Sequence, residues 1–103
     1  MELRVNELIQ YVDGEVWKDE DGKLTLGKIL KFAIRRPIQG DNQDGVKTYH
    51  LGQLWDQIQS SEKIPDGALD LPVEDVALLK ERIAKTVADP VLVKRVWDAL
   101  EAK

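Results

Sequence analysis

Cysteine is absent from this 103-residue chain, and histidine occurs once, as His50. Without cysteine there can be no disulfide, no thiolate metal ligand and no cysteine nucleophile, and a reducing, intracellular setting is favoured. A single histidine cannot supply a second imidazole ligand within one chain. We therefore expect His50 to be an ordinary surface side chain that faces solvent.

Long apolar runs and an excess of positive charge are also missing. No stretch reaches the ~18 apolar residues of a transmembrane helix, and the start MELRVNELIQ carries charge inside its apolar run. We expect neither a membrane span nor a signal peptide. The net charge is −4 and the sequence pI is about 5.0, whereas affinity for nucleic-acid backbones comes mainly from clustered Lys and Arg. These features predict a cytoplasmic protein that binds another protein rather than nucleic acid.

Known catalytic and ligand-binding motifs are lacking too. Neither GxGxxG nor GxxxxGKS/T occurs, so no glycine-rich phosphate loop is predicted. The acidic stretches 19–22 and 41–45 resemble fragments of calcium loops. The first, however, would need Trp17 and Lys28 as its first and twelfth ligands, and the second would need Leu51 as its twelfth. The sequence thus predicts no catalytic residue, no metal site and no cofactor, and a protein that is not an enzyme.

The clearest positive pattern is a helical hairpin at the C-terminal end. Glu74 and Asp75 suit the first turn of a helix that begins near Pro72. A second helix is predicted to begin at Asp89-Pro90, a side-chain cap followed by a proline at the first helical position. Helical spacing predicts an inward face made of Val76, Leu79, Ile83, Val93, Val96, Trp97 and Leu100.

A third helix is predicted from the N-cap Thr25 to about Arg36, because Pro37 cannot continue it. Gly27 lies in its first turn, where it would let another backbone approach closely. The inward residues predicted for this helix are Leu26, Ile29, Leu30, Ala33 and Ile34.

A fourth helix is predicted over KTYHLGQLWDQIQ, between loops at 38–46 and 60–67. Its inward residues are predicted to be Leu51, Leu54, Trp55 and Ile58, with Tyr49 as a further candidate. Residues 68–71 then suit a short strand that pairs with an N-terminal β-hairpin.

The first 18 residues fit two alternatives. Asp13-Gly14 suits a tight hairpin turn between the flanks 8–12 and 15–18. A helix over residues 3–12 stays open, because its apolar residues also recur at helical spacing. We favour the hairpin. The predicted fold is a single α+β domain over residues 1–103, mostly helical, with an N-terminal β-hairpin packed on about four short helices.

Basic residues supply the candidate partner surface, which consists of Lys28, Lys31, Arg35, Arg36 and Lys47. The first four give the helix 25–36 the pattern K-x-x-K-x-x-x-R-R. We see no aromatic or amide residues interleaved to stack on or read bases, so a solvated or protein-binding face is favoured over nucleic acid. Trp17, Trp55 and Trp97 are expected in the core, and a partly exposed one would be an interface anchor.

Five stretches occur in a characteristic order: DG at 13–14, DGKLTLG at 21–27, KTYHL at 47–51, DLPVEDVALLK at 70–80 and WDALE at 97–101. This order resembles a group of small, mostly uncharacterised proteins encoded by tailed phages and prophages. Pro72 departs from the group, which often has a capping Ser or Thr there, and this departure moves the expected cap to Asp70. The resemblance implies a viral protein without known catalysis that serves virion or tail assembly. It transfers no functional residues.

We therefore expect a non-enzymatic phage or prophage protein that acts by protein–protein interaction, in the cytoplasm of the bacterial host or associated with the virion. Two alternatives remain: a small nucleic-acid-binding regulator that uses the helix 25–36, and a host-directed inhibitor protein. An exposed apolar strip on the last helix would also allow a dimer.

Overall fold

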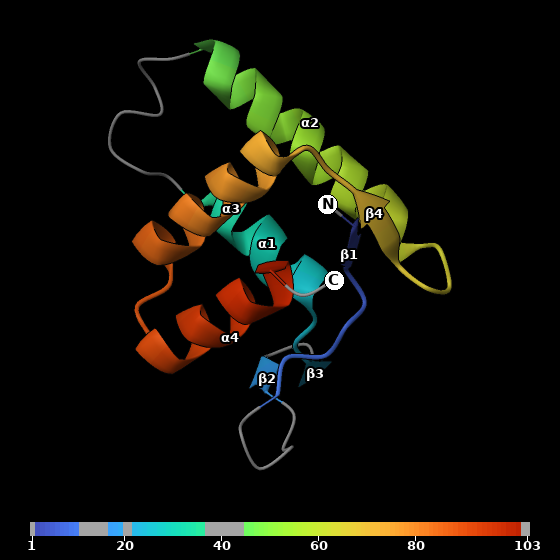
Figure 1. The fold of residues 1–103 in the computed structure, drawn as a ribbon, viewed down its shortest axis with the longest axis vertical. Helices are drawn as coiled ribbons and strands as arrows, with labels where there is room; N and C mark the ends of the chain where they lie inside the picture. The colour runs from blue at the N-terminus through green and yellow to red at the C-terminus, as the bar shows by residue number, and fades with distance from the viewer. Residues whose placement is uncertain (1, 11–16, 20–21, 37–44, 102–103) are drawn as a thin grey trace.

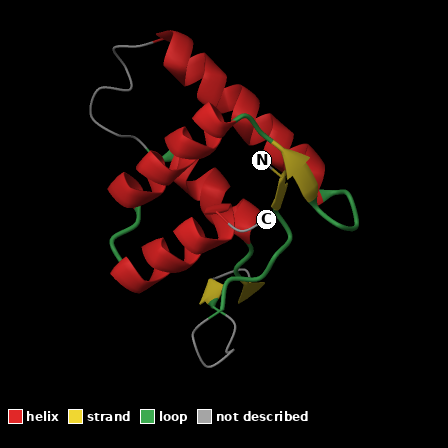
Figure 2. Ribbon diagram, in the orientation of Figure 1, coloured by secondary structure: helices red, strands yellow, loops and turns green. Residues whose placement is uncertain are grey.

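A computed structural model describes residues 2–10, 17–19, 22–36 and 45–101 of the chain (Figure 1). Within these residues lie four helices and four short strands: β1 (Glu2–Arg4), β2 (Lys18–Asp19), β3 (Gly22–Lys23), α1 (Leu26–Arg35), α2 (Gly45–Glu62), β4 (Ala68–Asp70), α3 (Val73–Thr86) and α4 (Pro90–Glu101). The predicted fold class, α+β and mostly helical, is confirmed (Figure 2).

The described strands form antiparallel pairs. β1 pairs with β4, with Leu3 opposite Leu69. The strand predicted at 68–71 is therefore present, but its partner is residues 2–4 and not the hairpin predicted between 8 and 18. Leu8 forms a β-bridge with Thr25. Residues 2–10 are therefore not helical, and the helical alternative for this segment is wrong.

The hairpin predicted around Asp13-Gly14 is described only at its base. Trp17 donates its backbone N–H to the Ile9 carbonyl at 2.7 Å, which joins the two predicted flanks, whereas the turn itself lies outside the described residues. The antiparallel pair β2–β3 occupies part of the acidic stretch 19–22, where no strand was predicted. Its two-residue strands are too short and polar to show the alternation by which strands are recognised.

The helices begin at the predicted caps in two cases. Thr25 Oγ1 accepts a hydrogen bond from the Lys28 N–H at 3.2 Å, and Asp89 Oδ1 accepts one from the Val91 N–H at 2.9 Å. Pro72 is the N-cap of α3, so the expected cap at Asp70 is wrong; proline has no side-chain acceptor, and no side-chain cap bond forms.

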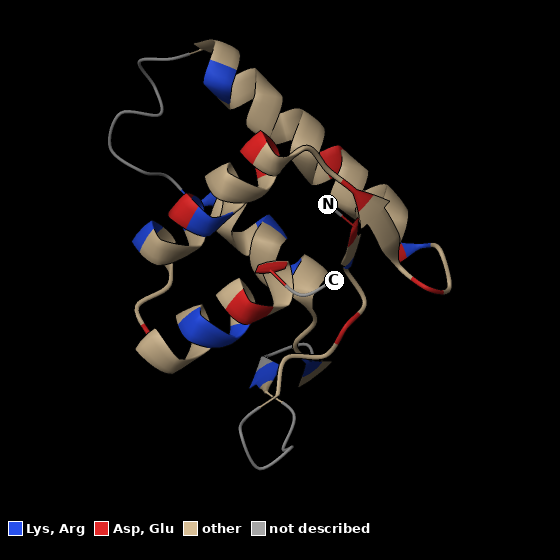
Figure 3. Cartoon of the chain, viewed as in Figure 1, with Lys and Arg blue, Asp and Glu red and all other residues tan. Residues whose placement is uncertain are grey.

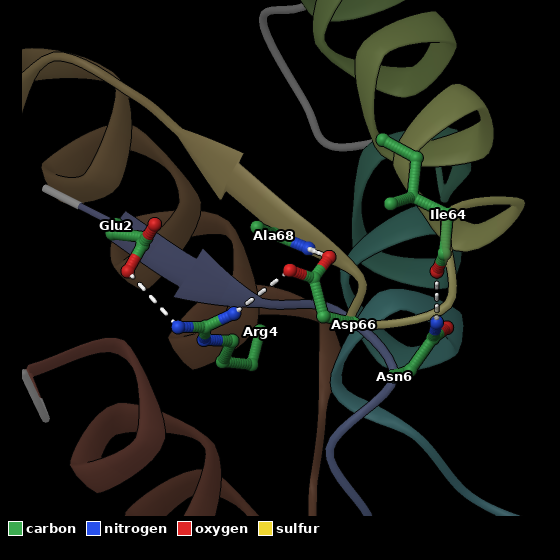
Figure 4. A network of polar contacts seen from close by, with 6 residues as sticks. All are labelled: Glu2, Arg4, Asn6, Ile64, Asp66 and Ala68. Atoms are coloured by element: carbon green, nitrogen blue, oxygen red, sulfur yellow. Dashed lines mark hydrogen bonds and ion pairs between the residues drawn. The ribbon is translucent and has the colours of Figure 1, made fainter.

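The helix α2 extends beyond the predicted range at both ends, from Gly45 to Glu62. Its C-terminal end is closed by Asn6, whose Nδ2 donates to the Ile64 carbonyl at 3.1 Å and to the Glu62 carbonyl at 3.4 Å (Figure 4). Arg4 lies in the same corner, 3.5 Å from Asp66. These partners are remote in sequence, so local pattern placed the end of α2 only approximately, at the loop predicted from residue 60.

The apolar core is centred on α1, which packs against both α2 and α3 (Figure 1). All inward residues predicted for α1 are buried. Two other predictions are wrong, because Tyr49 is 71% exposed and Trp97 is 36% exposed. Tyr49 lies in the N-terminal part of α2, which extends past the other helices (Figure 1). The buried face of α4 is formed by Leu92, Val96 and Leu100, and Trp97 lies outside it.

The N-terminal end of α1 is satisfied by the segment after β1. The Leu26 N–H donates to the Glu7 carbonyl at 2.9 Å, and the Gly27 N–H donates to the Val5 carbonyl at 2.7 Å. A Cβ on Gly27 would lie 3.0 Å from that carbonyl and 2.6 Å from Glu62 Oε2. The close backbone approach predicted for Gly27 is therefore confirmed.

The C-terminal end of α1 is satisfied by Arg82 of α3, which is buried with 2% of its surface exposed. Its Nε donates to the Ala33 carbonyl at 3.0 Å, and one of its terminal nitrogens donates to the carbonyls of Ile34 at 3.1 Å and Arg36 at 2.8 Å. These carbonyls belong to the helix end that lacks partners within the helix and carries partial negative charge. A buried cation is therefore placed where backbone dipoles stabilise it.

We predict that Arg82→Met lowers the free energy of unfolding by about 3 kcal/mol or more, because it leaves buried carbonyls without donors. Urea denaturation followed by circular dichroism measures the loss. Arg35→Met, at an exposed position on α1, should lower the free energy by less than about 1 kcal/mol. Equal losses in the two variants would contradict the capping role.

A second prediction compares two glycines that both lie in helices. Gly52→Ala should stabilise by up to about 1 kcal/mol, because nothing lies within 4 Å of the added Cβ and alanine favours helix. Gly27→Ala gains the same propensity but displaces Glu62 and the Val5 backbone, so it should lower the melting temperature. Thermal denaturation measures the melting temperature of both variants. A higher melting temperature in both would show that the packing at Gly27 is loose.

Candidate binding groove

The five basic residues predicted as a partner surface do not form one surface. Lys31 points to α2, where its Nζ lies 2.7 Å from Gln59 Oε1 and 2.5 Å from Glu62 Oε1. It also lies 5.3 Å from the centre of the Trp55 ring. Lys31 is only 20% exposed. It therefore connects α1 to the end of α2 and is not free to meet a partner.

Lys28 and Arg36 lie on a different side of α1, together with Phe32. These residues are spaced four apart, so they follow one another along the helix surface. Phe32 is 46% exposed, and the Arg36 guanidinium lies 5.6 Å from the centre of its ring. Our interpretation of the sequence, that no aromatic residue lies among the basic residues of this helix, is therefore wrong. Arg35 is exposed but lies outside this row, and Lys47 lies on α2.

A groove of about 440 Å³ runs beside this row. One wall is α1, through Lys28, Ile29, Phe32 and Arg36. The opposite wall is the connection between α3 and α4 together with Leu92, and Trp17, Lys18 and Leu24 of the β2–β3 region complete it. The apolar side chains of the lining come from three separate parts of the chain, so only the folded protein has this groove.

The charge around the groove differs from that of the whole protein. Among the described lining residues, Lys18, Lys28 and Arg36 are cationic, although the chain carries a net charge of −4. Over the described elements as a whole, basic and acidic residues are interspersed (Figure 3). The acidic lining residue Asp89 already accepts hydrogen bonds from the N–H groups of Val91 and Leu92 at the start of α4. Its negative charge is therefore stabilised by the helix rather than by the lysines. The groove is apolar inside and basic at its edge.

A second groove, of about 510 Å³, lies on the other side of the same connection and shares Val87 and Ala88 with the first. Its apolar lining includes Val93 and Trp97. The charged residues at this groove are Lys94, Asp98 and Glu101, and Lys94 forms an ion pair with Asp98 at 2.8 Å. Glu101 forms an ion pair with Lys80 at 3.1 Å, and Lys80 lies 5.6 Å from the centre of the Trp97 ring. The charged side chains at the second groove are therefore paired with one another, unlike those described at the first.

The described lining of the first groove includes one hydroxyl-bearing side chain, Thr86. This hydroxyl is occupied, because it donates to the Arg82 carbonyl at 2.7 Å. No cluster of metal-ligating side chains exists within the described part of the chain. Likewise, none of the described helices is long and apolar enough to cross a bilayer.

No protein-family model, curated protein or solved structure matches this chain.

Phe32 and Lys18 were missed as candidate residues. The signal for Phe32 was present, because it sits between two basic residues at helical spacing on a helix whose other apolar residues face inward. Lys18 gave no such signal, since the β2–β3 hairpin that brings it to the groove was not predicted.

His50 connects two helices rather than pointing only to solvent. Its Nε2 lies 2.7 Å from Asp75 Oδ1, so it joins α2 to the start of α3. The imidazole is 41% exposed and the carboxylate 14%. The hydrogen bond with Asp75, aided by its negative charge, raises the pKa of His50 against the opposing effect of burial. The contact is therefore strongest when His50 is protonated.

Because the pKa of His50 is higher in the folded chain than in the unfolded one, its contribution to stability is complete below about pH 6.5 and is lost as pH rises through the raised value. We expect the difference in unfolding free energy between the parent and His50→Gln to be larger near pH 5.5 than near pH 8.5. Urea titrations at both pH values test this. Asp75→Asn should remove the same dependence, and a pH-independent difference would contradict the assignment.

Proposed function

We propose that this protein acts without catalysis by binding another protein, and that the groove beside Phe32 is the binding surface. Following the resemblance to small phage and prophage proteins, we propose that the partner takes part in virion or tail assembly and is met in the host cytoplasm or on the virion.

The observation that carries the proposal is the row of Lys28, Phe32 and Arg36 along the groove, in which Phe32 and Arg36 are exposed and Lys28 is partly exposed. A half-exposed aromatic ring beside an apolar groove suits an interface, because aromatic and arginine side chains contribute most of the binding energy at protein contacts. The volume of about 440 Å³ is enough to take side chains from a partner.

A nucleic-acid regulator is the alternative that Phe32 favours, because one aromatic ring between two cations could stack on a base. Two features weigh against it. Lys31, one of the four cations of the proposed nucleic-acid surface, is paired with Glu62, and the net charge of −4 repels phosphates. A host-directed inhibitor would use the same groove and differ only in the identity of the partner.

Site-specific photocrosslinking tests the proposal. We expect a photoreactive phenylalanine analogue at position 32 to capture an assembly or virion protein in cells that produce the phage. The same analogue at position 73 should not, because Val73 is 63% exposed but lies outside both grooves, at the opposite end of α3 from the α3–α4 connection. The crosslinked partner is identified by mass spectrometry.

The capture at position 32 should be lost when Arg36→Glu is added. Nucleic acid as the only crosslinked species would favour the regulator instead, and a protein with a host function would favour the inhibitor. Failure to capture any protein at position 32 would refute binding through this groove.

A further inference from the structure

We infer that the occupant of this groove is an acidic amphipathic segment of the partner, with carboxylates on both sides of an apolar anchor. This inference rests on the proposed function and adds the chemistry of the partner to it.

The first step is the placement of charge along α1. Lys28 and Arg36 are two turns apart, or about 12 Å at 1.5 Å per residue, and Phe32 lies midway between them. The apolar centre of the groove is thus bracketed by cations along the helix. A partner helix lying alongside α1 would match this pattern with an apolar residue flanked by acidic residues four positions before and four positions after it.

The second step is that these cationic heads are held near the edge of the groove. Lys28 Nζ donates to the Lys23 carbonyl at 3.0 Å, and the Arg36 guanidinium packs over the Phe32 ring. Neither contact involves a carboxylate. The N–H groups of the Arg36 guanidinium therefore remain able to donate to both oxygens of a partner's carboxylate. Lys18, which is exposed, adds a third positive charge from the β2–β3 hairpin.

The third step is the contrast with the second groove, where the charged lining residues are Lys94, Asp98 and Glu101. The lysines at that groove already pair with carboxylates, Lys94 with Asp98 and Lys80 with Glu101, so an acidic segment would be attracted more strongly to the first groove. Complementary charge of this kind selects the partner and accelerates its association more than it adds affinity. The apolar surfaces alone would not distinguish the two grooves.

Synthetic helical peptides test the inference. The probe is a fluorescein-labelled peptide with a central leucine and glutamates four residues before and after it. Two twin peptides carry glutamine or lysine in place of the glutamates. We expect anisotropy titrations with the full chain to show the tightest binding for the glutamate peptide, and binding that weakens as salt is raised.

Two neighbouring residues provide the matched control. Arg36→Glu should weaken binding of the glutamate peptide by at least about tenfold, whereas Arg35→Glu should change it less than about twofold. Both are exposed at the same helix end, but successive residues point about 100° apart, and only Arg36 lines the groove. Circular dichroism confirms that both variants are folded, and Phe32→Ser gives a second, uncharged variant that should also weaken binding.

Equal or tighter binding of the glutamine or lysine peptide, abolished by Phe32→Ser, would overturn the acidic partner and leave the proposed function standing. Equal weakening by Arg35→Glu and Arg36→Glu would overturn it as well, because the attraction would then be non-specific. If no peptide bound, the inference would fail, while crosslinking at position 32 would still decide independently whether the groove binds a protein.

Discussion

Both ends of α1 are closed by side chains and backbone from remote parts of the chain, and the rest of the fold depends on this constraint. Because α1 is buried between α2 and α3, water cannot readily satisfy the backbone groups that a helix leaves unpaired at its ends. The Val5 and Glu7 carbonyls meet the N-terminal groups, and Arg82 meets the C-terminal ones. The first residues of the chain and the middle of α3 are thereby held on one helix.

This closure also limits where the protein can bind a partner. The positive end of a helix is a common anion site, but in α1 its N–H groups already have acceptors. The face toward α2 is occupied as well, by Lys31 and its contacts with Gln59 and Glu62. The side of α1 that carries Phe32 is not covered by another of the described helices. The groove lies between this side and the α3–α4 connection.

The sequence predicted those parts of the fold that local chemistry determines. The caps Thr25 and Asp89 placed two helix starts, and helical spacing identified the buried face of α1, because side-chain capping and amphipathic periodicity act within a few residues. Contacts between residues that are far apart in the chain were not predicted. Asn6 donates to carbonyls at and just beyond the end of α2, and Arg82 would be read from its helix as one more surface charge. Neither contact has a local signature.

The candidate site shows the same division, and a helical projection of α1 explains it. At about 100° per residue, the buried positions span one side of the helix, with Lys31 at one edge of the open side, Arg36 at the other and Arg35 between them. We grouped these residues from the sequence because all are cationic, although their side chains point in different directions from the helix axis. On the same projection Phe32 and Arg36 lie on one side of Arg35 and Lys31 lies on the other, so the outward position of Phe32 would have separated Arg36 from Lys31. The opposite wall could not have been found in this way, since it is formed by segments that only tertiary packing brings near.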